Sequence, residues 1–171
     1  MNKRYNFIIQ LNKMSLNEIK NQDLWTMQCD WICITTNCLL NKNGSAIMGA
    51  GLALQAKQKV KGCEIVLGKK IKSSGNHVYQ FGHFGDKILF SFPTKNNWRE
   101  NSSLKLIEQS CQELSSLWVN EVKLNPLKRP KVCLSKVGCL NGGLDYEKQV
   151  RPILQKYFAN EEMAQWFFVC I

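Results

Sequence analysis

The stretch from residue 31 to residue 57 places the strongest constraint on what this chain can fold into. Trp31 to Ile34 is apolar and β-prone, Asn37 ends that run, and Gly49 and Gly51 stand where helix-forming composition begins. Glycines let backbone N–H groups approach an anion closely, and the first turn of a helix leaves such donors unpaired with a favourable dipole behind them. The stretch therefore predicts a buried strand, a polar loop and a helix start suited to a phosphate group.

Two familiar phosphate-binding motifs do not match this stretch. The P-loop requires Gly-Lys-Ser or Gly-Lys-Thr, which the glycine-rich segment lacks. The dinucleotide-binding fingerprint requires a third glycine after Gly51, where the sequence has Ala53 and Leu54. A Gly-Ala-Gly segment alone is as often simple turn chemistry, so any anion site here is of another kind.

Length and composition favour one domain. A chain of 171 residues with 44% apolar residues can bury a sizeable core, and no change in composition marks a boundary, so residues 1–171 are expected to form a single domain. No apolar run approaches the roughly 18 residues of a membrane helix. The N-terminal apolar stretch is too short for a signal peptide. We expect a cytoplasmic protein that does not contact membranes.

Cysteine and histidine positions argue against a metal site. None of the eight cysteines forms a Cys-x-x-Cys pair, and His77 and His83 lie apart from such a set. Cys33, Cys133 and Cys170 lie inside apolar runs, as reduced core cysteines do. We therefore expect neither a bound metal nor another cofactor.

The formal charge of +10 favours partners that carry phosphate. Six lysines fall between Lys57 and Lys72, and Lys128, Arg129 and Lys131 form a second cluster. Charge runs are usually solvated surface, and these clusters lack the interleaved aromatic residues of a single-strand binding groove. Nucleic acid is thus a candidate partner.

Hydrophobic periodicity predicts strands that alternate with helices. The expected strands cover residues 5–11, 31–36, 77–82, 87–92, 132–137 and 166–171. The expected helices cover residues 51–61, a long segment capped by Ser102, a segment beginning near Gln149 and a short one at 16–20, while 64–67 fits either state. This order is typical of an α/β sandwich with a mixed sheet and helices on both faces.

In the long helix, apolar residues recur at intervals of three and four, the spacing of one buried helix face. These residues are Leu104, Ile107, Cys111, Leu114 and Trp118.

Three polar or glycine-rich segments follow predicted strands, at residues 37–51, 93–99 and 138–145. Ligands of such sheets bind beyond the carboxyl ends of the strands. We expect the three segments to form one cleft.

At four segments the sequence resembles the macrodomains that bind ADP-ribose. These are Ile34-Thr35-Thr36-Asn37, the segment from Met48 to Lys57, Phe92-Pro93-Thr94-Lys95 with Trp98-Arg99, and the segment from Val137 to Tyr146. The likeness is to the branch with the bacterial DNA-ADP-ribosyl glycohydrolase antitoxins and the eukaryotic terminal ADP-ribose glycohydrolase. It implies a three-layer α/β/α sandwich with a mixed central sheet.

The resemblance also implies roles for individual residues. Asn37 would contact the distal ribose and Lys95 would take part in catalysis, while the loop from Gly49 to Leu52 would hold the diphosphate. The loop from Gly138 to Leu144 would wrap the other side of the diphosphate and the distal ribose. The implied ligand-binding residues are Thr36, Gly49, Ala50, Gly51, Leu52, Thr94, Gly138, Cys139, Asn141, Gly142, Gly143 and Leu144.

This sequence departs from the family pattern at several positions. Ile34 replaces a common asparagine, and Asn96 or Asn97 replaces a histidine of the antitoxins. Gly142 stands where the eukaryotic enzyme has an aspartate, and residues 41–45 lengthen the loop after Asn37. Asn12 lies near the position of the aspartate that contacts adenine.

The function implied is an ADP-ribosyl hydrolase that releases ADP-ribose from DNA or protein. Lys95 would act either as a nucleophile at the anomeric carbon or as a cation that stabilises negative charge. The alternatives are a phosphatase acting on ADP-ribose 1''-phosphate and a module that binds ADP-ribose without turnover. No apolar surface is left over for self-association, so we expect a monomer.

Overall fold

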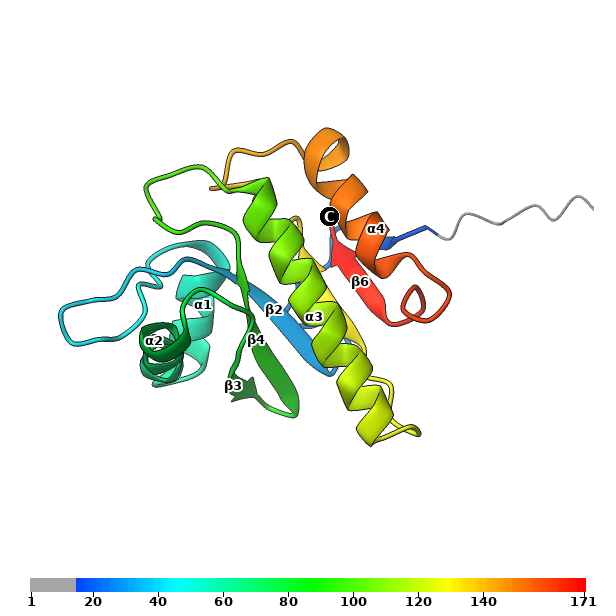
Figure 1. The fold of residues 1–171 in the computed structure, drawn as a ribbon, viewed down its shortest axis with the longest axis horizontal. Coiled ribbons are helices and arrows are strands. Elements are labelled where there is room, and N and C mark those ends of the chain that lie inside the picture. Colours follow the sequence, from blue (N-terminus) through cyan, green and yellow to red (C-terminus); the bar gives the residue numbers. More distant parts are fainter. Residues whose placement is uncertain (1–14) are drawn as a thin grey trace, which may run out of the picture.

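The computed structural model describes residues 15–171, in which six strands form one sheet in the order β1-β6-β5-β2-β4-β3 (Figure 1). All neighbouring strands are parallel except β3, which pairs with β4 antiparallel at an edge. The strands are β1 (Asn17–Ile19), β2 (Trp31–Thr36), β3 (Gln80–Phe84), β4 (Lys87–Pro93), β5 (Val132–Ser135) and β6 (Phe167–Cys170). The strand predicted at residues 5–11, like Asn12, lies outside the described residues.

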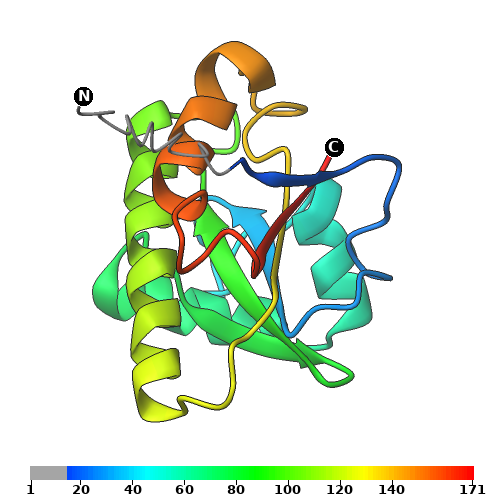
Figure 2. The same cartoon turned by 90° about the vertical axis from the view of Figure 1, so that its right-hand side faces the viewer.

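Helices cover both faces of this sheet. They are α1 (Gly51–Lys59), α2 (Cys63–Ser74), α3 (Leu104–Leu124) and α4 (Arg151–Phe158). Helices α3 and α4 share one apolar core with one face of the sheet, and α1 and α2 share a second core with the other face. Figure 2 shows α3 and α4 on one side of the strands and α1 on the other. The predicted three-layer sandwich with a mixed sheet is confirmed.

Strand β2 is the centre of both cores. It pairs with β4 along its whole length and with β5 at its start. Successive side chains of a strand point to opposite faces, so Ile32 and Ile34 pack under α1 and α2 while Trp31 and Cys33 pack under α3 and α4. A strand covered on both faces needs an uninterrupted apolar run, which is what the sequence has here.

The apolar face predicted for the long helix is buried as expected. Ile107, Cys111, Leu114 and Trp118 are all fully buried. The Trp118 indole Nε1 donates a hydrogen bond to the Pro130 carbonyl at 2.8 Å, so the polar edge of this core side chain also has a partner.

Several predicted boundaries are wrong. Residues 16–20 do not form a helix, because the backbone of β1 pairs with β6 from Asn17 to Ile19. The strand expected at 77–82 begins only at Gln80, and β5 ends at Ser135 and not at residue 137. Residues 64–67, which fit either state, belong to α2. The regular helix expected to begin near Gln149 begins two residues later, at Arg151 of α4, after a π-helical turn, η1 (Tyr146–Val150).

No helix among residues 15–171 is both long enough and apolar enough to cross a membrane.

The edge strand β1 is fastened to the helical layer by one carboxylate. Glu18 accepts hydrogen bonds from Arg151 Nε at 2.8 Å and from the Tyr146 hydroxyl at 2.7 Å. Burial by itself would raise the pKa of Glu18, but the hydrogen bonds from Arg151 and Tyr146 outweigh it, so the pKa lies below its usual value. A carboxyl with a lowered pKa in the folded protein stabilises the fold above its unfolded pKa and loses that effect as the pH falls.

We therefore predict that Glu18→Gln lowers the free energy of unfolding at pH 7, and that the difference from the wild type shrinks as the pH falls below about 4.5. Urea denaturation between pH 3 and pH 7 measures this. Glu147→Gln is the matched control, because its carboxylate is exposed and lies 3.7 Å from the same Arg151. A pH-independent difference for Glu18→Gln would contradict the assignment.

Candidate ligand-binding site

Because β2, β4, β5 and β6 are parallel neighbours, their carboxyl ends meet at one edge of the sheet. Two cavities of about 430 and 490 Å³ lie at this edge, here called the first and the second cavity. Both are lined by Thr35, Thr94, Lys95 and Asn141. They are therefore adjoining parts of one cleft, formed by the three loop segments predicted to converge.

Most of the site residues named from the sequence line this cleft. Thr36, Asn37, Gly49, Ala50, Thr94, Lys95 and Asn141 line the first cavity, and Gly51, Leu52, Gly138, Cys139 and Gly142 line the second together with Thr94, Lys95 and Asn141. Gly143 and Leu144 line neither: Leu144 packs against the α3 core, and Gly143 takes the positive φ of 72° that turns the loop.

The two glycine-rich loops meet at the start of α1. Ala50 is the N-cap of α1 and supplies no side-chain cap, so first-turn N–H groups remain available at the cleft. Gly51 has a φ of +53°, which favours glycine. A Cβ added there would lie 3.4 Å from Asn141 Nδ2, which belongs to the other loop. The Asn141 side chain of one loop therefore lies beside the start of α1, which follows the other loop.

Lys95 bridges the loops that border the two cavities. Its Nζ donates hydrogen bonds to the Glu100 carbonyl at 2.8 Å and to the Asn141 carbonyl at 3.0 Å. An ammonium has three N–H donors, so one remains for a ligand. Two carbonyls from separate loops thus fix the position of this cation in the cleft.

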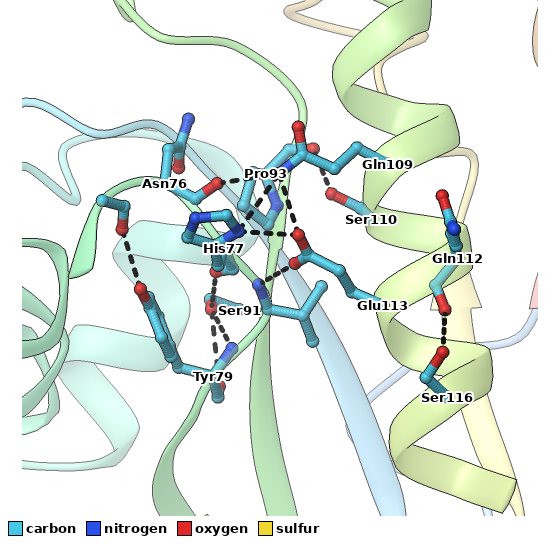
Figure 3. A network of polar contacts seen from close by, with 12 residues as sticks. Asn76, His77, Tyr79, Ser91, Pro93, Gln109, Ser110, Gln112, Glu113 and Ser116 are labelled. Atoms are coloured by element: carbon cyan, nitrogen blue, oxygen red, sulfur yellow. Dashed lines mark hydrogen bonds and ion pairs between the residues drawn. The ribbon is translucent and has the colours of Figure 1, made fainter.

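The segment before β3 forms a hydrogen bond to the backbone of Lys95. Asn76 Nδ2 donates to the Lys95 carbonyl at 3.2 Å and to Asn96 Oδ1 at 3.0 Å. The next residue, His77, contacts Glu113 of α3 through Nδ1 at 2.6 Å, and the Val78 N–H donates to the same carboxylate (Figure 3).

Helix α3 also holds the end of β4 directly. The Ser110 hydroxyl donates to the Pro93 carbonyl at 2.8 Å, as Figure 3 shows, and the Ser103 N–H donates to the Thr94 carbonyl at 2.8 Å. Lys95 therefore follows a strand end that is anchored to the longest helix of the fold.

Asn37 closes its own loop. Its Oδ1 accepts from the Leu39 N–H at 2.9 Å, and its Nδ2 donates to the Ile47 carbonyl at 3.1 Å. The side chain is buried but lines the first cavity, and its amide keeps one N–H and one lone pair for a ligand. The sequence did not indicate this loop-closing role.

The longer loop that Asn37 closes rests on α2. The Ala46 N–H donates to the Glu64 carbonyl at 2.9 Å. A Cβ added to Gly68 would lie 2.2 Å from the Gly44 carbonyl oxygen, so here the backbones of loop and helix pack directly against each other.

Gly142 has no room for a side chain. A Cβ added there would lie 2.2 Å from both the Gly138 carbonyl oxygen and the Ser102 hydroxyl. A carboxylate at this position, such as the aspartate of the eukaryotic glycohydrolases, would require the loop to take another shape.

The serine predicted to cap α3 does not do so. Ser103 is the N-cap, and its hydroxyl accepts from the Leu106 N–H. Ser102 lines the second cavity, and its buried hydroxyl has no hydrogen-bond partner among the described residues. The sequence offered two adjacent serines, and nothing local distinguished them.

The ionisable residues of the cleft are mostly basic. Lys95 and Lys136 line it, opposed by a single carboxylate, Asp23, and neither cavity has a histidine or glutamate among its described lining residues. Burial raises the pKa of the Cys139 and Cys170 thiols to about 11, so both are neutral at pH 7. Residues 15–171 hold no cluster of three His, Cys, Asp or Glu side chains that would suit a metal.

The sequence analysis did not identify several lining residues. Asp23 and its neighbours Gln22 and Leu24 follow β1, the strand that replaces the helix expected at residues 16–20. Gln55 lies one helical turn after Gly51, a spacing that would have indicated it. Ala53 also belongs to α1. The others come from strand ends and loops: Thr35, Ile47, Trp98, Ser102, Ser135, Lys136, Leu140, Cys170 and Ile171.

No protein-family model matches the chain. It is 27% identical over 135 residues to the DNA ADP-ribosyl glycohydrolase of Thermus aquaticus, and 29% identical over 137 residues to that of Mycobacterium tuberculosis. These matches cover 74% and 73% of this chain but only 35% and 34% of the two relatives. The chain thus spans about a third of the length of the curated relatives it matches.

Among solved structures, the macrodomain of Mycobacterium tuberculosis DarG superposes on this chain with a TM-score of 0.71 at 25% identity. The match covers 91% of this chain and 97% of that macrodomain, so the two share the whole fold. The chain has the macrodomain fold. Ile34 is fully buried among the side chains of α1 and α2 and lines neither cavity, so it contributes to the core.

The two serines at the start of α3 give a paired prediction. Ser103→Ala should lower the free energy of unfolding by about 1 kcal/mol, because a helix cap is lost. Ser102→Ala should leave it unchanged or raise it, because a buried hydroxyl without a partner is removed. Urea denaturation of the two variants measures the difference, and the reverse order of stabilities would contradict it.

Proposed function

We propose that this macrodomain binds ADP-ribose in the cleft and hydrolyses the bond that joins the distal ribose to a macromolecule. The observation that carries the proposal is the position of Lys95, whose ammonium is held by two carbonyls and which lines both cavities. The names of the two relatives, DNA ADP-ribosyl glycohydrolases, support the same reaction.

The chemistry of the two cavities suggests how ADP-ribose lies. The second cavity combines the α1 start, the loop at 138–142 and Lys136, which together suit a diphosphate. Asp23 at its wall is a carboxylate acceptor suited to the exocyclic amino group of adenine. The distal ribose would then lie in the first cavity, beside Asn37 and Lys95.

Hydrolysis breaks the bond between the anomeric carbon and the acceptor atom. A water oxygen bonds to that carbon, and a proton from the water ends on the leaving atom. Lys95 has one N–H left to stabilise charge that develops on the leaving atom or on a ribose oxygen. Nucleophilic attack of Lys95 on the anomeric carbon would require its amine to break the hydrogen bonds to the Glu100 and Asn141 carbonyls. We therefore favour the charged role over the nucleophilic one.

A second candidate function is binding without turnover. The first cavity has no carboxylate or histidine among its described lining residues, so a general base for water is not supplied there. The phosphatase reaction on ADP-ribose 1''-phosphate would use the same binding geometry and belongs in the same assays.

The acceptor is DNA or protein, and the charge of +10 favours nucleic acid. A monomer in the cytoplasm remains our prediction.

Substitution of Lys95 tests the hydrolase. We expect Lys95→Ala to lower the rate of ADP-ribose release about 100-fold or more, the loss typical of one stabilising donor, with a much smaller change in ADP-ribose affinity. Lys95→Arg should retain part of the activity if charge is what matters and none if the amine is a nucleophile. Lys105→Ala, an exposed lysine on α3, is the control.

Release is measured on ADP-ribosylated DNA, ADP-ribosylated protein and ADP-ribose 1''-phosphate, and affinity by calorimetry with ADP-ribose. Binding by the wild type without release from any of the three would favour the non-catalytic module. An undiminished rate for Lys95→Ala would remove Lys95 from the mechanism.

A further inference from the structure

Trp98 stands apart from the other large aromatic side chains. Its side chain is 49% exposed, and every other tryptophan or phenylalanine among the described residues is buried or partly buried. It also lines the first cavity, three residues after Lys95. An indole left half in water at the wall of a cavity is more typical of a binding surface than of a core.

Arg99 completes a basic aromatic surface. Its guanidinium carbon lies 4.5 Å from the centroid of the Trp98 ring, within the range of a cation–π contact. The turn that carries both residues is ordered by Asn97, whose Oδ1 accepts from the Arg99 N–H at 3.0 Å and whose carbonyl accepts from the Glu100 N–H at 3.1 Å. The same Glu100 carbonyl binds Lys95 Nζ, so this surface and the proposed catalytic cation are parts of one turn.

The location of this surface indicates what it would meet. With the diphosphate in the second cavity and the distal ribose beside Lys95, the group attached to that ribose would extend into the rest of the first cavity, which Trp98 lines and which the second cavity does not share with it. This step rests on the proposed function. The surface therefore faces the acceptor rather than ADP-ribose itself.

The chemistry of the surface favours a nucleotide as that acceptor. A nucleobase offers a flat π face for an indole, and the adjoining phosphates offer anions for a guanidinium. The first cavity has no carboxylate among its described lining residues to repel a phosphate, and the chain carries a charge of +10. A carboxylate side chain of a protein acceptor would use the positive charge but not the exposed aromatic face.

We propose that Trp98 and Arg99 form a binding site for the acceptor nucleotide of ADP-ribosylated single-stranded nucleic acid. The modified base, or its neighbour, stacks on the Trp98 indole, and a flanking phosphate pairs with Arg99. The strand is single because a base that carries ADP-ribose into the cleft cannot stay stacked within a duplex. The site would act on substrate choice, while Lys95 acts on the bond that breaks.

The test compares acceptors in one preparation. We expect Trp98→Ala to lower kcat/KM for an ADP-ribosylated single-stranded oligonucleotide about 5- to 100-fold, the loss of one base–aromatic stack. Release from ADP-ribosylated protein and the affinity for free ADP-ribose should change less than about 2-fold, since these acceptors make no such stack. Trp98→Phe should restore most of the activity on the oligonucleotide, and Leu127→Ala, a fully exposed apolar residue outside both cavities, is the control.

Arg99 has its own readout. Arg99→Ala should reduce by about one the slope of log affinity against log salt for the modified oligonucleotide, because one phosphate contact is lost. Arg99→Lys should keep the slope but lose part of the affinity, since lysine does not stack as guanidinium does.

Several outcomes would overturn the inference while leaving the proposed hydrolase intact. These are equal losses by Trp98→Ala on oligonucleotide and protein, an unchanged rate on the oligonucleotide, or release by the wild type from protein alone. If the wild type binds ADP-ribose but releases it from none of the substrates, the proposal of a hydrolase is wrong. The acceptor site is then tested by comparing the affinities for the modified oligonucleotide and for free ADP-ribose. The inference is supported if the wild type binds the oligonucleotide more tightly than ADP-ribose and Trp98→Ala removes this difference. Equal affinities in the wild type would overturn it. If the wild type does not bind ADP-ribose, both proposals fail.

Discussion

The parallel pairing of β2 with β4 and β5 is the constraint on which the rest of the molecule depends. Strands that run in the same direction bring their carboxyl ends to one edge, so the loops that follow them must share that edge. This arrangement places Thr36, Lys95 and Lys136 at the same cleft, although they are far apart in the sequence. The apolar run from Trp31 to Ile34 makes the pairing stable, since it fills the cores on both faces at once.

The cleft shows how little side-chain chemistry such a site needs. The start of α1 has no side-chain cap, so its first-turn N–H groups are available, and Lys95 supplies a cation whose position is set by two carbonyls. Donors of this kind are already oriented before a ligand arrives, so binding does not have to pay for their ordering. The residues behind them, among them Asn76 and Ser110, contribute by fixing the backbone and not by touching the ligand.

Much of this could be predicted from the sequence, for identifiable reasons. The central strand has an uninterrupted apolar run and the long helix has a strong periodic pattern, and the structure confirms both. The helix predicted at residues 16–20 is wrong because this segment forms β1 by pairing with β6, and no local sequence pattern indicates that pairing. The cap of α3 was placed one residue early because Ser102 and Ser103 are chemically equivalent until the fold buries one of them. The same limit applies to Asp23, whose place at the cleft depends on where β1 pairs.

The contact between Gly68 and the loop at 41–45 links the length of one segment to the identity of a residue in another. The loop can lie this close only because α2 presents a bare backbone at Gly68, where the Gly44 carbonyl packs, so the loop conformation and the glycine depend on each other. A related protein with a shorter loop would be free to carry alanine or a larger residue at that helical position, and would gain helix stability from it. The loop after β2 is therefore less free to vary than its place on the surface suggests, because the backbone of α2 limits the conformations that it can take.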